Sequence, residues 1–165
     1  MAAFTGTPVN SDLMADQKDA DSTGARADSL ATSAGVHAAY AEYTHSSTAG
    51  TGTGAIDMFR LPAGRLRILC DQSRVVTSAF ASNADLHIGY RAHTDLDGDA
   101  VVEDDNAFSD NLDAGGGALD VAWALPAGGI LELNSEEGVD IYCLVDTGNI
   151  EATDTINLLC LYQMM

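Results

Sequence analysis

Apolar and polar side chains alternate at every second position over many short stretches of this chain. The period of two is clearest in Val36–Thr44, where small and aromatic residues alternate. A period of two is typical of β-strands, because successive side chains of a strand point to opposite faces. We therefore expect about nine strands, separated by turn residues. They are Val36–Thr44, Ala55–Leu61, Arg65–Cys70, Val75–Ala81, Leu86–Arg91, Ala118–Ala124, Gly129–Leu133, Val139–Val145 and Thr155–Gln163.

Short strands at regular spacing predict an all-β fold, an antiparallel β-sandwich of the jelly-roll-like kind. An internal echo supports two related halves, because Leu-Pro-Ala-Gly occurs at both Leu61–Gly64 and Leu125–Gly128. An aromatic residue precedes each copy and an apolar stretch follows it. The alternative is that the two copies are simply the same common turn, in which proline fixes φ and glycine permits the next bend.

The length of 165 residues fits one domain. Residues 1–30 are rich in Ala, Asp, Ser and Thr and lack a stable apolar period, so we expect an N-terminal arm there. Residues 31–165 then form the sandwich domain. Within it, residues 93–117 are acidic and glycine-rich, which predicts a long loop.

Charge is distributed very unevenly. The net charge is -18, and no Lys or Arg occurs between Ala92 and Met165. Such a negative surface repels phosphates and anionic lipids, so we expect neither nucleic acid nor membrane as a partner. No apolar run is long enough to cross a bilayer, and Met1–Asp12 lacks the features of a secretory signal.

The segment from Asp95 to Glu103 is the strongest candidate for a metal site. Asp95, Asp97 and Asp99 alternate around Gly98, and Glu103 follows. Hard cations such as Ca²⁺ are bound by several carboxylate oxygens on a tightly turning loop. The pattern departs from a helix-loop-helix calcium site, since the flanking residues indicate strands. Either Ca²⁺ binds here as the one cofactor, or the segment is a solvated acidic loop.

Basic residues gather around one predicted turn. Arg60, Arg65 and Arg67 flank it, and Arg74 follows. In so acidic a chain these four arginines form a candidate partner-binding surface for carboxylates. The alternative is that they pair with acids of their own chain.

Signatures of catalysis are missing from the sequence. We find no zinc-binding His or Cys pairs at metal-site spacing and no nucleophile elbow, so we assign no catalytic residue and expect no enzyme. Cys70, Cys143 and Cys160 each lie in an apolar stretch, which predicts buried thiols in a reducing compartment. A disulfide between Cys143 and Cys160 on adjacent strands is the alternative.

Residues 55–145 resemble head-associated virion proteins of tailed bacteriophages. The resemblance rests on Leu61–Gly64, on the strand Leu86–Tyr90, and on the acidic loop that ends in Asn106–Phe108. It implies a jelly-roll-like structural protein, made in the host cytoplasm, that decorates or cements the outside of a capsid. It also implies a homotrimer that binds the major capsid protein, with an arm over neighbouring capsid subunits. No functional residue carries over.

A second hypothesis belongs to a different class. An all-β domain with exposed aromatic residues and an acidic loop also suits a carbohydrate- or Ca²⁺-binding module of a phage fibre or a secreted protein. Glycan binding through Tyr40, Tyr43, Tyr90 or Trp123 would distinguish this hypothesis from binding to capsids in many copies.

Overall fold

The computed structural model describes residues 9–10, 35–46, 50–51, 54–80, 84–124 and 131–165. These residues form β-strands and no helix, which confirms the predicted all-β fold. The strands are β1 (Val9–Asn10), β2 (Val36–Thr44), β3 (Gly50–Thr51), β4 (Gly54–Leu61), β5 (Gly64–Ile68), β6 (Arg74–Thr77), β7 (Asp85–Tyr90), β8 (His93–Thr94), β9 (Ala100–Val101), β10 (Asp104–Asp113), β11 (Asp120–Ala122), β12 (Leu131–Ser135), β13 (Val139–Thr147), β14 (Asn149–Ile150) and β15 (Thr155–Met164).

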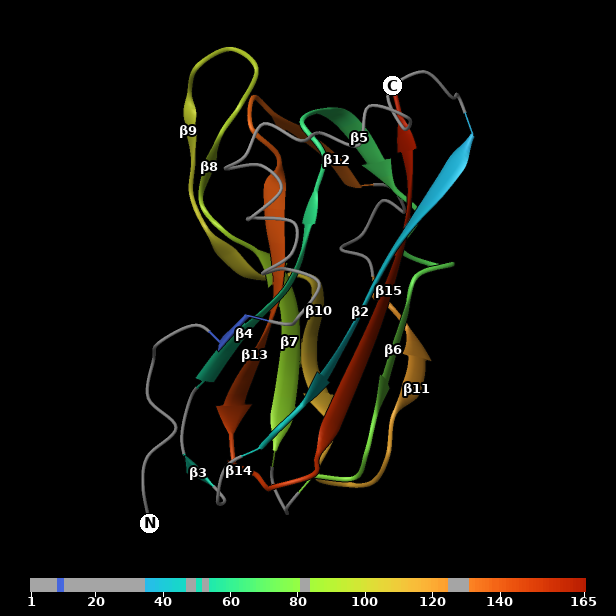
Figure 1. Ribbon diagram of the computed structural model, residues 1–165, viewed down its shortest axis with the longest axis vertical. Helices are drawn as coiled ribbons and strands as arrows, with labels where there is room; N and C mark the ends of the chain where they lie inside the picture. Colours follow the sequence, from blue (N-terminus) through green and yellow to red (C-terminus); the bar gives the residue numbers. More distant parts are fainter. Residues whose placement is uncertain (1–8, 11–34, 47–49, 52–53, 81–83, 125–130) are drawn as a thin grey trace.

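Two larger sheets make the sandwich, with the strands arranged in two layers (Figure 1). The first, here called the β13 sheet, has the order β1-β4-β13-β7-β10. The second, the β15 sheet, is centred on β15. Its full length pairs with β2 on one side, and on the other side it pairs with β6 and then β5. Strands β11 and β12 pair with β6 and β5 at the far edge. Apart from the β1–β4 pair, which is parallel, these ladders are antiparallel.

The core lies between the sheets and is built by the alternation seen in the sequence. On β15, the inward residues Ile156, Leu158, Cys160 and Tyr162 are buried, and the residues between them are partly exposed. The β13 sheet supplies the opposite layer, with Val139, Ile141, Cys143 and Val145 of β13 at 0% exposure. Burying two complementary apolar faces is the main free-energy gain that fixes this fold.

The turn Leu61–Gly64 carries the chain from β4 in one sheet to β5 in the other. Gly64 has a φ of +119°, a backbone conformation that glycine adopts more readily than other residues. This copy of Leu-Pro-Ala-Gly is therefore a corner of the sandwich. The second copy, at residues 125–128, lies outside the described residues.

The prediction of a loop over residues 93–117 was wrong. This segment contains the hairpin β8–β9 and the ten-residue strand β10, which pairs with β7 at the edge of the β13 sheet. Two register shifts interrupt that pairing and break the alternation of side chains. Only Ala107, Phe108 and Ser109 of β10 are buried, so its sequence lacks the apolar signal of a strand.

The boundary between arm and domain, predicted near residue 30, lies outside the described residues. Within the predicted arm the structure describes only Val9–Asn10, which pair with Ile56–Asp57 of β4. Among the described residues, no helix is long and apolar enough to cross a membrane.

Candidate functional site

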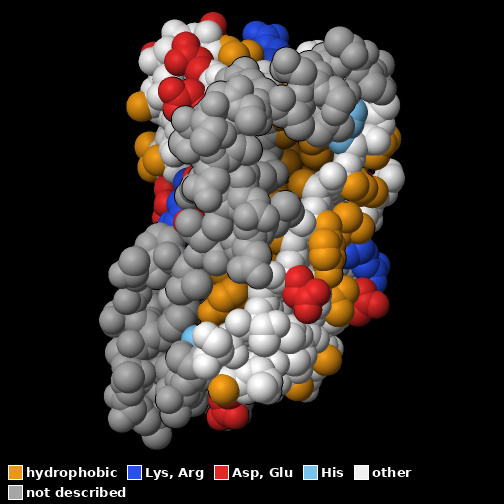
Figure 2. Space-filling model, viewed as in Figure 1, with side chains coloured by type: hydrophobic (Ala, Val, Ile, Leu, Met, Phe, Trp, Pro, Cys, Tyr) orange, Lys and Arg blue, Asp and Glu red, His pale blue; other side chains and the backbone are white. Residues whose placement is uncertain are grey.

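The outer surface of the β15 sheet carries an unusual number of apolar side chains. We call Val36, Ala38 and Tyr40 of β2, with Leu159 and Leu161 of β15, the apolar face. Leu159 lies opposite Tyr40, and Leu161 opposite Ala38. Val36 is 52% exposed and Tyr40 50%. Figure 2 shows hydrophobic side chains gathered on this side of the molecule.

This face is held in a fixed shape by its own polar groups. The Tyr40 hydroxyl donates a hydrogen bond of 2.9 Å to Asn157 Oδ1, which joins β2 to β15 on the outer side. The nine-residue pairing of β2 with β15 runs without a register shift. A regular, pre-formed apolar surface loses little conformational entropy when a partner covers it.

Three of the four predicted partner-binding arginines lie beside the apolar face. Arg65 and Arg67 alternate with buried residues on β5, and Arg74 does so on β6. The register places Arg67 opposite Gln163 and Arg74 opposite Leu159 of β15. The sequence had predicted a shared face for Arg65 and Arg67, and the pairing of β5 and β6 with β15 adds Arg74 to the same surface.

Most of these arginines are already paired with acids of the same chain. Arg67 Nη2 lies 3.1 Å from Glu132 Oε1, and Arg74 forms an ion pair with Asp120. Arg65 is exposed and makes no ion pair within the part of the chain that the structure describes. Exposed ion pairs contribute little to stability, so these arginines can exchange partners at a small free-energy cost.

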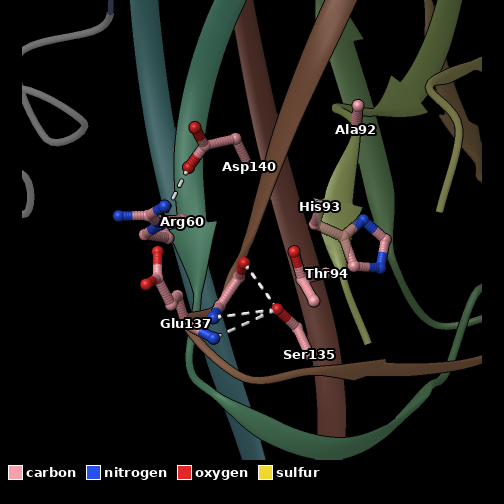
Figure 3. A pocket seen from close by; sticks show the side chains of 8 residues that line it. Arg60, Ala92, His93, Thr94, Ser135, Glu137 and Asp140 are labelled. Carbon is pink, nitrogen blue, oxygen red and sulfur yellow. Dashed lines mark hydrogen bonds and ion pairs between the residues drawn. The ribbon is translucent and has the colours of Figure 1, made fainter. Parts of the chain in front are cut away.

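Arg60 is separated from the other three. It lies on β4 in the β13 sheet, where its Nε is 3.1 Å from Asp140 Oδ1. Figure 3 shows this pair at the side of a polar pocket of about 150 Å³, with His93 and Ser135 nearby. The Ser135 hydroxyl is held by Gly138, donating to its carbonyl at 2.9 Å. The pocket is small and polar, and the partner-binding role of Arg60 stays a prediction.

The outer surface of the β13 sheet is organised in the opposite way, around the partly buried Arg91. Arg91 Nε donates to Asp57 Oδ1 at 2.8 Å, and Nη1 donates to Glu103 Oε2 at 3.0 Å. Its guanidinium lies 3.9 Å from the ring centre of Tyr142, whose hydroxyl donates to Glu103 Oε1 at 3.1 Å. We call Asp57, Arg91, Glu103 and Tyr142 the Arg91 network. Asp57 and Tyr142 are 5% and 1% exposed.

Electrostatics in the Arg91 network follow from this burial. Burial raises the pKa of the Tyr142 hydroxyl, and the nearby Glu103 carboxylate raises it further. Burial alone would lower the pKa of Arg91, but its hydrogen bonds to Asp57 and Glu103 outweigh that effect and raise it. These hydrogen bonds tie β4 and β13 to the segments after β7 and before β10, which suits a structural role.

In the same sheet, the backbone of β7 lies very close to the start of β10. A Cβ atom on Gly89 would lie 2.0 Å from the Asp104 carbonyl oxygen, so β7 needs glycine where β10 begins. Beside it, the side chain of His87 is buried, with Nδ1 3.1 Å from Asp110 Oδ1 and Nε2 3.8 Å from Asp146 Oδ2. Acidic side chains thus lie beside both Arg91 and His87 on this face.

The four candidate metal ligands are divided between the β8–β9 turn and the Arg91 network. Asp95 closes the β8–β9 turn, because its Oδ1 accepts the backbone N–H groups of Asp97 and Asp99 at 2.9 Å each. Glu103 instead belongs to the Arg91 network. Among the described residues, no group of three or more His, Cys, Asp or Glu side chains is arranged to hold a metal ion. Cation binding at the turn stays a prediction.

The interpretation of Cys143 and Cys160 as neighbours on adjacent strands was wrong. Cys143 lies on β13 between Ile56 of β4 and Ile88 of β7, whereas Cys160 lies on β15 in the other sheet. All three cysteines are buried thiols, as predicted.

Comparison with known proteins identifies the fold. No family model and no curated sequence matches the chain. A chain of the capsid of Ralstonia phage GP4 has a similar structure, with a TM-score of 0.68 at 16% identity. The similarity covers 96% of this chain and 99% of that one. A chain of the capsid asymmetric unit of cyanophage Pam1 matches with a TM-score of 0.55 at 15% identity, over 79% of this chain and 85% of that one.

Proposed function

We propose that this chain is a structural protein of a tailed-phage virion that decorates or cements the capsid. The observation that carries the proposal is the whole-chain match to a protein of the GP4 capsid. Because the match covers nearly all of both chains, that capsid protein has almost the same length and no large additional domain. A small all-β protein of this size suits an accessory subunit bound to a capsid lattice.

The apolar face is the surface that we assign to binding. Exposed apolar area next to exchangeable arginines is the composition expected of a protein interface, where aromatic and arginine side chains are enriched. The partner is the major capsid protein on the outside of the particle, approached by carboxylates that replace Glu132 and Asp120 on the arginines. The remaining acidic surface faces solvent, since burying unpaired carboxylates is costly.

Self-association is the second part of the proposal. The resemblance implies a homotrimer, and a protein of 17.2 kDa with an exposed apolar sheet surface has area available for contacts between copies. Sedimentation velocity of the purified chain at micromolar concentration tests this directly. A single species at the trimer mass is expected, and a monomer across the concentration range contradicts the trimer while leaving capsid binding open.

Capsid binding is tested with particles that lack this protein. The full chain is added to them, the particles are sedimented, and bound protein is quantified against the major capsid protein. We expect saturation at a fixed ratio and weaker binding of Tyr40→Ala and Arg67→Glu. Val102→Ala serves as the control, because Val102 is 78% exposed and lies away from the β15 sheet, just before β10. Absence of saturable binding by the unmodified chain would reject the proposal.

A further inference from the structure

Two of the buried thiols lie next to each other where β5 meets β15. The register of this pair matches Leu66 with Met164, Arg67 with Gln163 and Ile68 with Tyr162. It continues one step beyond β5, because Leu69 N–H donates to the Leu161 carbonyl at 2.8 Å. Carried one residue further, into the turn that begins at Cys70, this register brings Cys70 level with Cys160.

A hydroxyl group fixes the turn that follows Cys70. Ser73 Oγ donates to the Leu69 carbonyl and accepts the Leu161 N–H, each at 2.9 Å. The turn is thereby attached to Leu161 on one side of Cys160, and the pairing of Arg74 with Leu159 attaches it on the other side. Directly opposite residues of antiparallel strands have Cβ atoms about 4.5–5.5 Å apart, close to the separation that a disulfide requires.

The environment of the two thiols is consistent with this placement. Both side chains are 0% exposed and belong to the same core. Burial raises the pKa of the Cys160 thiol, and the neighbouring Cys70 raises it further, in agreement with the placement that the register gives. Burial alone raises the pKa of Cys143, which lies on β13 in the other sheet.

We propose that Cys70 and Cys160 are a redox pair, reduced in the structure and able to close to a disulfide when a small-molecule disulfide oxidises them. One thiolate attacks the oxidant and releases the first small thiol, forming a mixed disulfide. The second thiolate then displaces the second small thiol. The protein loses two protons and two electrons, and the S–S bond of the oxidant is cleaved to two thiols. This inference does not depend on the proposed function.

Burial also sets the rate of this reaction. Burial raises the pKa of Cys70 to about 11, so little reactive thiolate is present at neutral pH. The pair therefore stays reduced while the protein folds in a reducing cell, and it closes slowly in an oxidising medium, when the turn opens. The closed loop spans more than half of the chain, and long loops are those that a disulfide stabilises most in the chain-entropy model.

Refolding in a glutathione redox buffer tests the pair without requiring the oxidant to enter the folded core. The full chain is unfolded, refolded with a mixture of reduced and oxidised glutathione, alkylated, and digested with trypsin and a glutamate-specific protease. The sequence makes the assignment unambiguous, because Cys70 falls in residues 68–74, Cys143 in residues 138–151 and Cys160 in residues 152–165. We expect residues 68–74 linked to residues 152–165.

Two serine variants supply the controls. Cys143→Ser should keep the link, and its melting temperature should rise by about 10 °C on oxidation and fall again with a reductant. Cys70→Ser should lose the link and show no reversible rise. Three alkylated thiols after refolding of a natively folded chain, or a link that includes Cys143, would overturn the proposal.

Discussion

The outer surfaces of the two sheets carry different kinds of side chain. On the β13 sheet, charged groups are paired with one another, because Arg91 donates hydrogen bonds to Asp57 and Glu103 while its guanidinium covers Tyr142. On the β15 sheet, apolar groups are exposed, with Val36 and Tyr40 about half accessible. The first arrangement stabilises the chain by itself, whereas the second gains stability only when something covers it. The difference indicates which surface is available to a partner.

The largest expected effect comes from opening the Arg91 network. In Arg91→Met, the buried carboxylate of Asp57 loses its ion-pair partner, which should cost about 3–5 kcal/mol of unfolding free energy. Urea unfolding followed by the fluorescence of Trp123, which is buried against Phe108, measures this cost.

Arg67→Met is the matched control on the other sheet. Its ion pair with Glu132 is exposed, so the expected loss is under about 1 kcal/mol. Equal losses in the two variants would mean that the two surfaces do not differ as described.

A second prediction concerns the backbone crossing on the β13 sheet. Gly89→Ala places a methyl group against the Asp104 carbonyl, so the start of β10 must move, at a cost of about 3 kcal/mol. Gly98→Ala is the control, because its φ of +85° is unfavourable for alanine but no atom lies within 4 Å of the new methyl group. That variant should lose only about 1 kcal/mol. Thermal unfolding of both variants measures the difference.

The sequence predicted the two surfaces unequally well. Side-chain burial alternates along strands β2 and β15, and their predicted bounds agree with the structure to within one residue. Strands β5 and β6 both pair with β15, which places Arg65, Arg67 and Arg74 on one surface, whereas the sequence had indicated a shared face only for Arg65 and Arg67. Strand β10 was missed because its outward positions are acidic and its bulges break the period of two. Periodicity detects a strand only where one face is continuously buried.

The Arg91 network could not be derived from sequence for a different reason. Its members come from β4, from the end of β7, from the segment before β10 and from β13, and only the sheet order β4-β13-β7-β10 brings them together. One signal was present, since Arg91 is the last basic residue before a long acidic half. Glu103 was assigned to a metal loop because its spacing from Asp99 is local, whereas its partners Arg91 and Tyr142 are not.

A third prediction separates stability from binding on the β15 sheet. Tyr40→Ala removes a half-exposed side chain and its hydrogen bond to Asn157, so the unfolding free energy should fall by about 1 kcal/mol. Binding to capsids should fall much further, by at least tenfold, if this side chain lies at the centre of the contact. Parallel measurements of urea unfolding and particle sedimentation test the separation. Unchanged binding would remove Tyr40 from the interface.

The smallest expected effect is a difference between two tyrosines at alkaline pH. Burial and then Glu103 raise the pKa of Tyr142 in the folded state above its unfolded value of about 10. Above that pH the unfolded chain releases the proton while the folded chain retains it, so this stabilisation is present below pH 10 and is lost as the pH rises.

Tyr142→Phe should therefore flatten the alkaline decline of the urea midpoint. Tyr40→Phe should flatten it less, because Tyr40 is exposed and its raised pKa is screened by solvent. Tyr43, Tyr90 and Tyr162 also have raised pKa values and contribute equally in both variants, so the difference between the two slopes isolates the Arg91 network. Equal slopes would show that the Tyr142 proton is not held by this network.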